Sequence, residues 1–186
     1  MINHKHKFIF IHIPKTAGVT IYSKLPLRKH KHKKISNYDS DKIDEYFTFS
    51  FVRNPFDRLV STYHFLNSES CMQWPRSNSK IHNLVKPMSF NEFVKNLFRI
   101  RNKHLETQFN YITHNSLKMD FIGKFENLQE DFNTICDKIG IPQQQLPHKN
   151  KSEHRHYTEY YDDETREIVA KKYAKDIEYF GYEFGD

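Results

Sequence analysis

The stretch that decides the fold class is "FIFIHIPKTAGVTIY", residues 8–22. Its apolar residues fall on both faces of an extended chain, which predicts a strand over 7–13 buried between two layers. The apolar run ends at Pro14, and apolar residues then recur at helical spacing from Val19 until Pro26. Many α/β proteins bind a phosphate where a strand turns sharply into a helix. The stretch therefore predicts a strand, an anion-binding loop and a helix.

This loop differs from the phosphate loop of the nucleotide triphosphatases. In their motif, G-x-x-x-x-G-K-[ST], the lysine follows the second glycine, whereas Lys15 here precedes Gly18. The order of residues disfavours a kinase or a nucleotide hydrolase of the P-loop type. The anion that the loop binds has to be inferred from the rest of the chain.

Length and composition predict one domain with an anionic partner. The 186 residues suffice for a single domain over 1–186, and 16 Phe and 11 Tyr supply a core. Lys and Arg number 29 against 23 Asp and Glu, which gives a formal net charge of +6. A modest positive field attracts a phosphorylated cofactor, an acidic glycan, nucleic acid or a membrane surface, and composition alone does not choose among them.

The cysteines and the hydropathy pattern predict a cytoplasmic protein. Cys71 and Cys136 form no C-x-x-C pair, so neither a zinc site nor a disulfide scaffold is expected. Residues 1–7 are polar, unlike a signal peptide, and no segment approaches the roughly 18 apolar residues of a membrane span. We therefore expect no membrane partner.

Strands and helices alternate along the rest of the sequence. A second buried strand over 46–52 leads into a helix that begins after Asn54, a good N-cap followed by proline. The other predicted elements are helices over 89–98, 127–140 and 162–173, a strand over 120–126 and a loop over 71–87. Capping patterns at Ser89 and Asn127 open two of these helices, and Gly140 closes the second. The alternation predicts a three-layer α/β fold, a central parallel sheet flanked by helices, with ligands at the carboxyl ends of the strands.

A second phosphate site is predicted where the strand over 46–52 ends. On the following helix, steps of about 100° place Ser61 opposite the apolar stripe, roughly in line with Asn54. Arg53, the helix N-terminus and the Ser61 hydroxyl can then converge on one anion, because a guanidinium binds phosphate through its planar fork. The alternative is that Arg53 forms a structural ion pair and Ser61 is a surface serine.

The two motifs together resemble those of the sulfotransferases that use 3′-phosphoadenosine-5′-phosphosulfate (PAPS). "HIPKTAGVT" resembles their 5′-phosphosulfate loop, and "FVRNPFDRLVSTY" resembles their 3′-phosphate element. The resemblance covers most of the chain, because three further stretches are similar to this family: "DFIGKFENLQEDF", "LPHKNKS" and "YAKDIEYFGYEF". The group concerned, sulfotransferase family 2, includes the carbohydrate O-sulfotransferases of the Golgi and many small bacterial proteins. The resemblance implies a P-loop-NTPase-like sulfotransferase fold.

The resemblance also implies an activity and a cofactor. The chain is expected to move the sulfuryl group of PAPS to a hydroxyl of an acceptor by in-line displacement, leaving PAP as the product. The acceptor is expected to be a small molecule or a glycan, in particular a carbohydrate or glycoconjugate, and not nucleic acid. No metal is expected to be required, because the leaving group carries only the charge of a nucleotide phosphate.

The residue assignments follow from matching positions. In this family the lysine of the first loop contacts the leaving phosphosulfate, which assigns that role to Lys15. Arg53 and Ser61 would take the 3′-phosphate, which distinguishes PAPS from ATP. Lys151 and Ser152 lie in a segment that resembles the one closing over the nucleotide. The residues expected to form the cradle are Pro14, Lys15, Thr16, Ala17, Gly18, Val19 and Thr20.

A hydroxyl acceptor needs a general base, and histidine is the commonest one. Related glycan sulfotransferases carry the base between the two phosphate motifs, where "RKHKHKK", residues 28–34, offers His32 first and His30 second. His104 is the further alternative, in a segment that resembles the acceptor side of the family together with Gln108. The other interpretation is that residues 28–34 form a solvated basic surface, or that they bind an acidic acceptor.

Three more histidines lie near the N-terminus. His12, on the first strand, is expected to be structural or a neighbour of the cradle, and His4 and His6 to lie in a mobile terminus.

The alternative function is that of a non-catalytic basic module that binds nucleic acid or an acidic glycan. A nonspecific binder has no need of a buried strand that ends in Pro-Lys-Thr-Ala-Gly. This motif favours the enzyme.

Overall fold

The computed structural model describes residues 1–28, 31–72, 77–115, 117–147 and 155–186. The chain divides into two compact units. The first comprises Met1–Arg53 and Thr107–Asn150, and the second comprises Asn54–Glu106 and Lys151–Asp186. Each unit has a hydrophobic core of its own. That the two act as one sulfotransferase domain stays a prediction.

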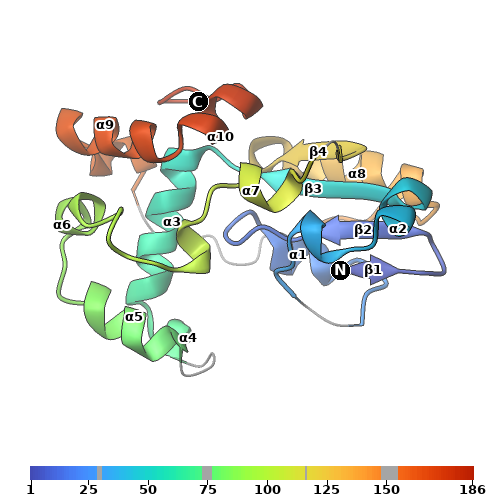
Figure 1. The fold of residues 1–186 in the computed structure, drawn as a ribbon, viewed down its shortest axis with the longest axis horizontal. Coiled ribbons are helices and arrows are strands. Elements are labelled where there is room, and N and C mark those ends of the chain that lie inside the picture. Colours follow the sequence, from blue (N-terminus) through green and yellow to red (C-terminus); the bar gives the residue numbers. More distant parts are fainter. Residues whose placement is uncertain (29–30, 73–76, 116, 148–154) are drawn as a thin grey trace. The chain divides into compact units, whose positions relative to one another are not determined.

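The first unit is built on a four-stranded sheet in the order β1-β2-β3-β4 (Figure 1). Its strands are β1 (Ile2–Asn3), β2 (Phe8–Ile11), β3 (Phe47–Val52) and β4 (Phe121–Lys124). β2, β3 and β4 run parallel, with Phe10 opposite Phe49 and Phe51 opposite Gly123. The predicted α/β class and the parallel arrangement of the three predicted strands are therefore confirmed.

The edge strand β1 corrects one expectation. Residues 2–3 pair antiparallel with β2, Ile2 opposite Ile9, and the His4 Nδ1 atom lies 2.9 Å from the Tyr46 hydroxyl. The segment around His4 and His6 is thus held by the sheet, and a mobile terminus is the wrong description. A strand of two residues is too short for an alternating pattern to reveal.

Helices cover the sheet on both faces. Figure 1 shows α8 (Leu128–Ile139) behind the sheet, with α2 (Ser40–Glu45) and α7 (Phe109–Ile112) in front. On one face the rings of Phe10 and Phe49 stack at 5.0 Å. The other members of this core are Met1, Phe8 and Phe51 in and beside the sheet, Ile21 and Leu25 in and after α1 (Gly18–Tyr22), and Phe132, Ile135, Cys136, Ile139 and Leu146 in and after α8. The unit also contains the 3-10 turns η1 (Ile35–Asn37) and η3 (Phe125–Asn127).

At the two ends of α8, the predicted C-terminal cap is confirmed and the predicted N-terminal capping box is not. Gly140 takes a left-handed conformation, φ 68°, and the Ile141 amide donates to the Cys136 carbonyl, so the helix ends where expected. At the start, and within the described chain, the Asn127 side chain makes no capping hydrogen bond. The 3-10 turn η3 runs directly into the helix there, and the predicted capping box is wrong.

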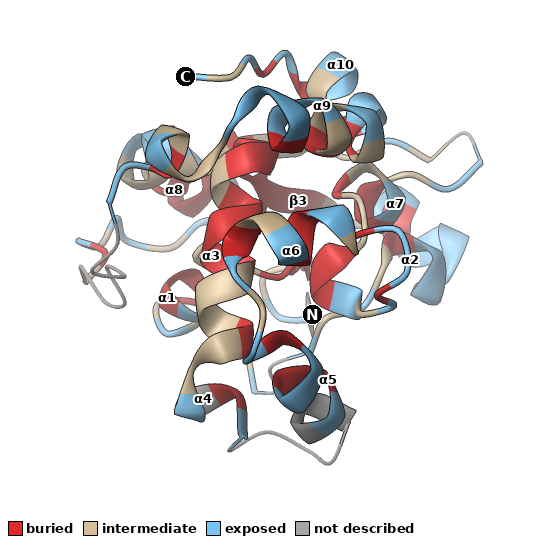
Figure 2. Cartoon of the chain, turned by 90° about the vertical axis from the view of Figure 1, so that its left-hand side faces the viewer, coloured by how far each residue is buried: buried red, intermediate tan, exposed pale blue. Residues whose placement is uncertain are grey.

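The second unit is helical. Its helices are α3 (Pro55–Asn67), α4 (Glu69–Met72), α5 (Ser77–Val85), α6 (Phe90–Lys95), α9 (Asp163–Lys172) and α10 (Ala174–Phe180), with the 3-10 turns η2 (Lys103–Leu105) and η4 (Tyr157–Tyr160). Asn54 caps α3 by accepting from the Phe56 amide, and Ser89 and Glu92 form the predicted capping box of α6. Figure 2 shows the buried residues concentrated along α3, which forms the centre of this core.

The predicted loop over 71–87 is wrong, because α5 and the end of α4 lie there. Ile81 and Val85, one helical turn apart, are buried in the core of the second unit. Polar residues around this pair obscure the helical period in the sequence. The last predicted helix, 162–173, corresponds to α9, and α10 follows it after Tyr173.

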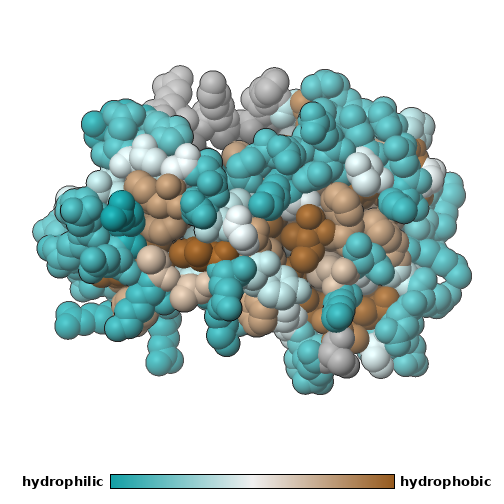
Figure 3. Space-filling model, turned by 90° about the horizontal axis from the view of Figure 1, so that it is seen from above, coloured by the Kyte–Doolittle hydropathy of each residue, from teal (hydrophilic) through white to brown (hydrophobic). Residues whose placement is uncertain are grey.

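Polar side chains dominate the face drawn in Figure 3, and apolar residues reach the surface between them. Among the helices that the structure describes, none combines the length and the hydropathy that crossing a bilayer requires.

Candidate functional site

The loop after β2 is tightly wound. Lys15 and Ala17 both have positive φ, 69° and 58°, which costs a non-glycine residue about 1–2 kcal/mol each. The buried Thr16 hydroxyl donates to the Ile13 carbonyl at 3.0 Å and closes the turn. Because the Thr16 hydroxyl donates its proton within the loop, the backbone amide is the group through which Thr16 could donate to a ligand. Strain of this kind is concentrated at ligand-binding loops.

Gly18 has a specific structural task beside this loop. A Cβ at Gly18 would lie 1.9 Å from both Cδ2 and Nε2 of His12, so the imidazole occupies the space that any other side chain would need. His12 itself is 2% exposed and stacks on Phe10 with the ring centroids 5.7 Å apart. The glycine therefore allows the ring at the end of β2 to pack directly on the start of α1.

His32 is attached to the same strand end. Its Nδ1 atom lies 3.1 Å from the His12 carbonyl oxygen, and the two imidazole rings are in contact, tilted by 39° with centroids 4.1 Å apart. A carbonyl only accepts hydrogen bonds, so Nδ1 carries a proton, and in the neutral imidazole Nε2 then has the lone pair. The half-buried His32 is thus held in the tautomer that a general base needs.

Arg53, at the end of β3, is fixed by its backbone and by its side chain. The Arg53 amide donates to Gln108 Oε1 at 2.9 Å, and Gln108 Nε2 donates back to the Arg53 carbonyl at 2.8 Å. The guanidinium lies 4.0 Å above the Phe125 ring and its Nη1 donates to the Lys15 carbonyl at 3.4 Å. Arg53 therefore joins the end of β3 to the loop after β2, within the first unit.

Gln108 was expected on the acceptor side, which stays a prediction, and the structure shows its side-chain amide bonded to the backbone of Arg53. The side chain is fully buried, so these two bonds satisfy groups that water does not reach. No periodic pattern signals such a contact, because it joins residues 55 positions apart.

The remaining predicted residues lie in the second unit and are described there. Ser61 is buried on α3, with 7% of its surface exposed. His104 is also buried. Its ring contacts that of Phe65 at a tilt of 42°, with centroids 5.0 Å apart, and its Nδ1 lies 2.7 Å from Asn102 Oδ1. Since Arg53 belongs to the first unit and Ser61 to the second, their convergence on one anion stays a prediction.

The other expected site residues differ in exposure. In the cradle, Val19 is 52% exposed while Thr20 is buried. The candidates outside the described residues are His30, Lys151 and Ser152, and their roles stay predictions. Among the residues that are described, no group of three His, Cys, Asp or Glu side chains is arranged to hold a metal ion.

Arg58 is a buried charged residue that the sequence reasoning missed. Only 1% of it is exposed, and its guanidinium donates to the His104 carbonyl at 3.2 Å and to the Glu106 carbonyl at 2.6 Å. The same group lies 5.4 Å from the centre of the Tyr173 ring, whose pKa burial raises to about 12. Arg58 thus holds the segment that carries His104. The apolar stripe of α3 does not predict this, because the helix is also buried on its other side.

Comparison with known proteins finds a matching family and several relatives. A family model described as "Sulfotransferase family" matches residues 1–183. Carbohydrate sulfotransferase 9 of Homo sapiens is 26% identical over 216 residues, 95% of this chain and 47% of the human protein. Carbohydrate sulfotransferase 14 of Danio rerio is 23% identical over 187 residues, 77% of this chain and 48% of that protein. An uncharacterized protein of Archaeoglobus fulgidus is 30% identical over 101 residues, 54% of this chain and 73% of that protein. The chain spans about half the length of the two carbohydrate sulfotransferases.

Proposed function

The chain belongs to the sulfotransferase family, and on that premise we propose that it transfers a sulfuryl group from PAPS to a hydroxyl of a carbohydrate or glycoconjugate. The observation that carries the proposal is the connection of three candidate residues in one unit. Arg53 reaches the carbonyl of Lys15, and His32 reaches the carbonyl of His12, three residues before Lys15. Cationic groups and a candidate base thus meet around the loop after β2.

The chemistry of these residues fits an anionic nucleotide. Lys15 is partly exposed on the wound loop, and the first amides of α1 have no partners within the helix. Arg53 adds a planar cation that suits a phosphate. When bound, PAPS supplies the sulfuryl group and leaves as PAP. Lys15 would hold the phosphate at the scissile bond and neutralise its charge, and Arg53 would hold the 3′-phosphate together with Ser61.

His32 is proposed to take the proton of the acceptor hydroxyl. Its Nδ1–H bond to the His12 carbonyl leaves Nε2 as the proton acceptor and restricts rotation of the ring. General-base catalysis is worth a factor of about 10² to 10⁴ in rate. His104 has the same tautomeric preference, because its Nδ1 faces Asn102 Oδ1, and it remains the alternative base.

The proposal is tested with labelled PAPS and a panel of acceptors that contains glycans, phenols, amines and peptides. We expect label on a sugar hydroxyl, and stabilisation of the protein against heat by PAP but not by ATP with magnesium. Transfer to phenols alone would contradict the carbohydrate acceptor. A preference for ATP, or tight binding to DNA without any effect of PAP, would contradict the enzyme class and favour the non-catalytic basic module.

A further inference from the structure

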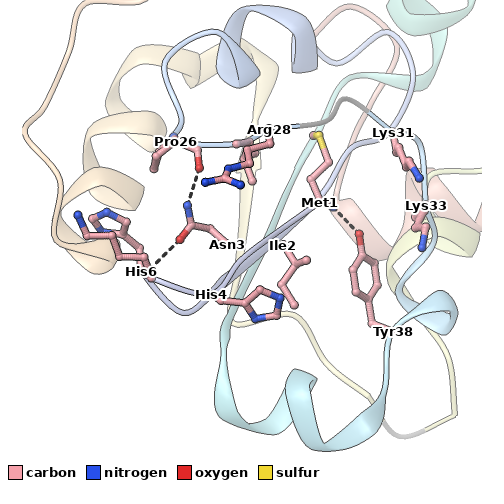
Figure 4. Close-up of a pocket in the computed structure, with 12 residues that line it drawn as sticks. Met1, Ile2, Asn3, His4, His6, Pro26, Arg28, Lys31, Lys33 and Tyr38 are labelled. Atoms are coloured by element: carbon pink, nitrogen blue, oxygen red, sulfur yellow. Dashed lines mark hydrogen bonds between the residues drawn. The ribbon is translucent and has the colours of Figure 1, made fainter.

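A pocket of about 780 Å³ opens in the first unit, between the edge strand and the segment that follows α1 (Figure 4). Its lining includes Asn3, Lys5, Arg28, Lys31, Lys33 and Tyr38. The described lining residues include neither the loop after β2 nor Arg53. The volume is typical of sites that bind small molecules, which range over about 300–1,000 Å³.

The charge of the lining is of one sign. Lys5, Arg28, Lys31 and Lys33 contribute cations, and no aspartate or glutamate is found among the described residues that line the pocket. A concave surface with charges of one sign concentrates counter-ions, so the pocket favours an anion. Four cations in one pocket suit a ligand with several negative charges better than a single monovalent ion.

The walls of the pocket are held by hydrogen bonds, as Figure 4 shows. Asn3 connects them: its Nδ2 donates to the Pro26 carbonyl at 2.5 Å, and its Oδ1 accepts from the His6 amide at 2.8 Å. On the opposite side Lys33 lies 5.7 Å from the centre of the Tyr38 ring. These contacts preform the pocket, which lowers the entropic cost of binding.

One wall also carries the candidate base. Lys31 and Lys33 line the pocket, whereas His32 between them bonds to the His12 carbonyl at the end of β2. Side chains alternate along an extended segment, so the cations and the imidazole lie on opposite sides of it. A ligand in the pocket would therefore contact the segment that positions His32.

We propose that this pocket is a second anion site, separate from the donor site, for a ligand with two or more sulfate, phosphate or carboxylate groups. Such groups occur on acidic sugars and on free polyphosphates. The binding itself does not depend on the proposed function, because none of the lining residues is assigned to PAPS.

The test is calorimetric titration of the full chain, saturated with PAP to fill the donor site. The probes are a sulfated heparin tetrasaccharide and tripolyphosphate, with neutral maltotetraose as control. The variant Arg28→Ala/Lys31→Ala removes two pocket cations, and Lys118→Ala/Lys138→Ala removes two exposed lysines of the same unit outside the pocket. We expect one binding site for at least one charged probe, with affinity about tenfold lower in the pocket variant and unchanged in the control variant.

Equal losses in both variants would overturn the proposal, since they would show attraction to the net charge only. Absence of binding by both charged probes, or equal binding of maltotetraose, would overturn it as well. Binding of the tetrasaccharide alone assigns the site to an acidic sugar, and binding of tripolyphosphate alone to a free phosphate compound. If circular dichroism shows that the first variant is unfolded, the test is repeated with Lys5→Ala/Arg28→Ala. Failure of PAP to bind would contradict the proposed function while leaving the titration valid.

Discussion

Replacement of Gly18 by alanine tests how the loop after β2 is packed. In an ordinary helix this change stabilises a protein by about 0.5–1 kcal/mol, because alanine loses less backbone entropy on folding. Here the new Cβ would lie 1.9 Å from two atoms of the buried His12 ring, so the ring or the helix must move. Overpacking of this kind costs about 1–3 kcal/mol. We therefore expect Gly18→Ala to destabilise the protein by about 2 kcal/mol.

The assay is urea unfolding of the parent, Gly18→Ala, His12→Ala and the Gly18→Ala/His12→Ala double variant, with Gly140→Ala made in both the parent and the His12→Ala background as control. Without the His12 ring the clash disappears, so Gly18→Ala should become stabilising in the His12→Ala background. Gly140→Ala is the matched control, because no atom lies within 4 Å of its Cβ and its cost of about 1–2 kcal/mol comes from a φ of +68° alone. That cost should be the same with and without His12. If Gly18→Ala has the same effect in both backgrounds, the packing argument is refuted.

Three further predictions concern the site and its surroundings. Gln108→Ala should destabilise the protein by about 2–4 kcal/mol and weaken PAP binding, because the buried amide and carbonyl of Arg53 lose their hydrogen-bond partner. Calorimetry checks this by comparison with Gln108→Glu, which keeps the acceptor for the Arg53 amide. His32→Ala should lower turnover by a factor of about 10² to 10⁴ with PAP affinity unchanged, and the rate should no longer depend on the ionisation of a histidine near neutral pH. If His104→Ala gives this result and His32→Ala does not, the base is His104. Hydrogen bonds from the Thr165 hydroxyl and amide lower the pKa of Asp162. The carboxylate therefore stabilises the fold above the usual carboxyl pKa, and this stabilisation is lost as the pH falls through the lowered value. When the free energy of unfolding is measured against pH, the Asp162→Asn variant should not show this loss.

The sequence predicted the parts of the fold that depend on local patterns. Continuous apolar runs identified β2, β3 and β4, since strands buried on both faces are apolar throughout. Caps at Asn54 and Ser89 and the closing Gly140 located helix ends, because these bonds involve neighbours in the chain.

The missed features depend on contacts between distant residues. Gln108 and Arg58 both donate to backbone carbonyls more than forty positions away, and nothing near them in sequence indicates this. Within the first unit, the sequence named Lys15, Arg53 and His32 through motifs. Which carbonyls Arg53 and His32 contact could be learned only from the sheet that brings β2 beside β3.

The division of each unit into two separate chain segments bears on synthesis. The sheet of the first unit lacks β4, and its core lacks Phe132 and Ile135, until the chain has been made well past residue 120. The ribosome adds about 5–20 residues per second, so β3 emerges several seconds earlier with one edge unpaired. The intervening segment Asn54–Glu106 belongs to the other unit, and its residues 54–72 and 77–106, which the structure describes, form no strand for that edge. An unpaired edge of an apolar strand can pair with another chain, so β3 is exposed to such pairing until β4 has been made.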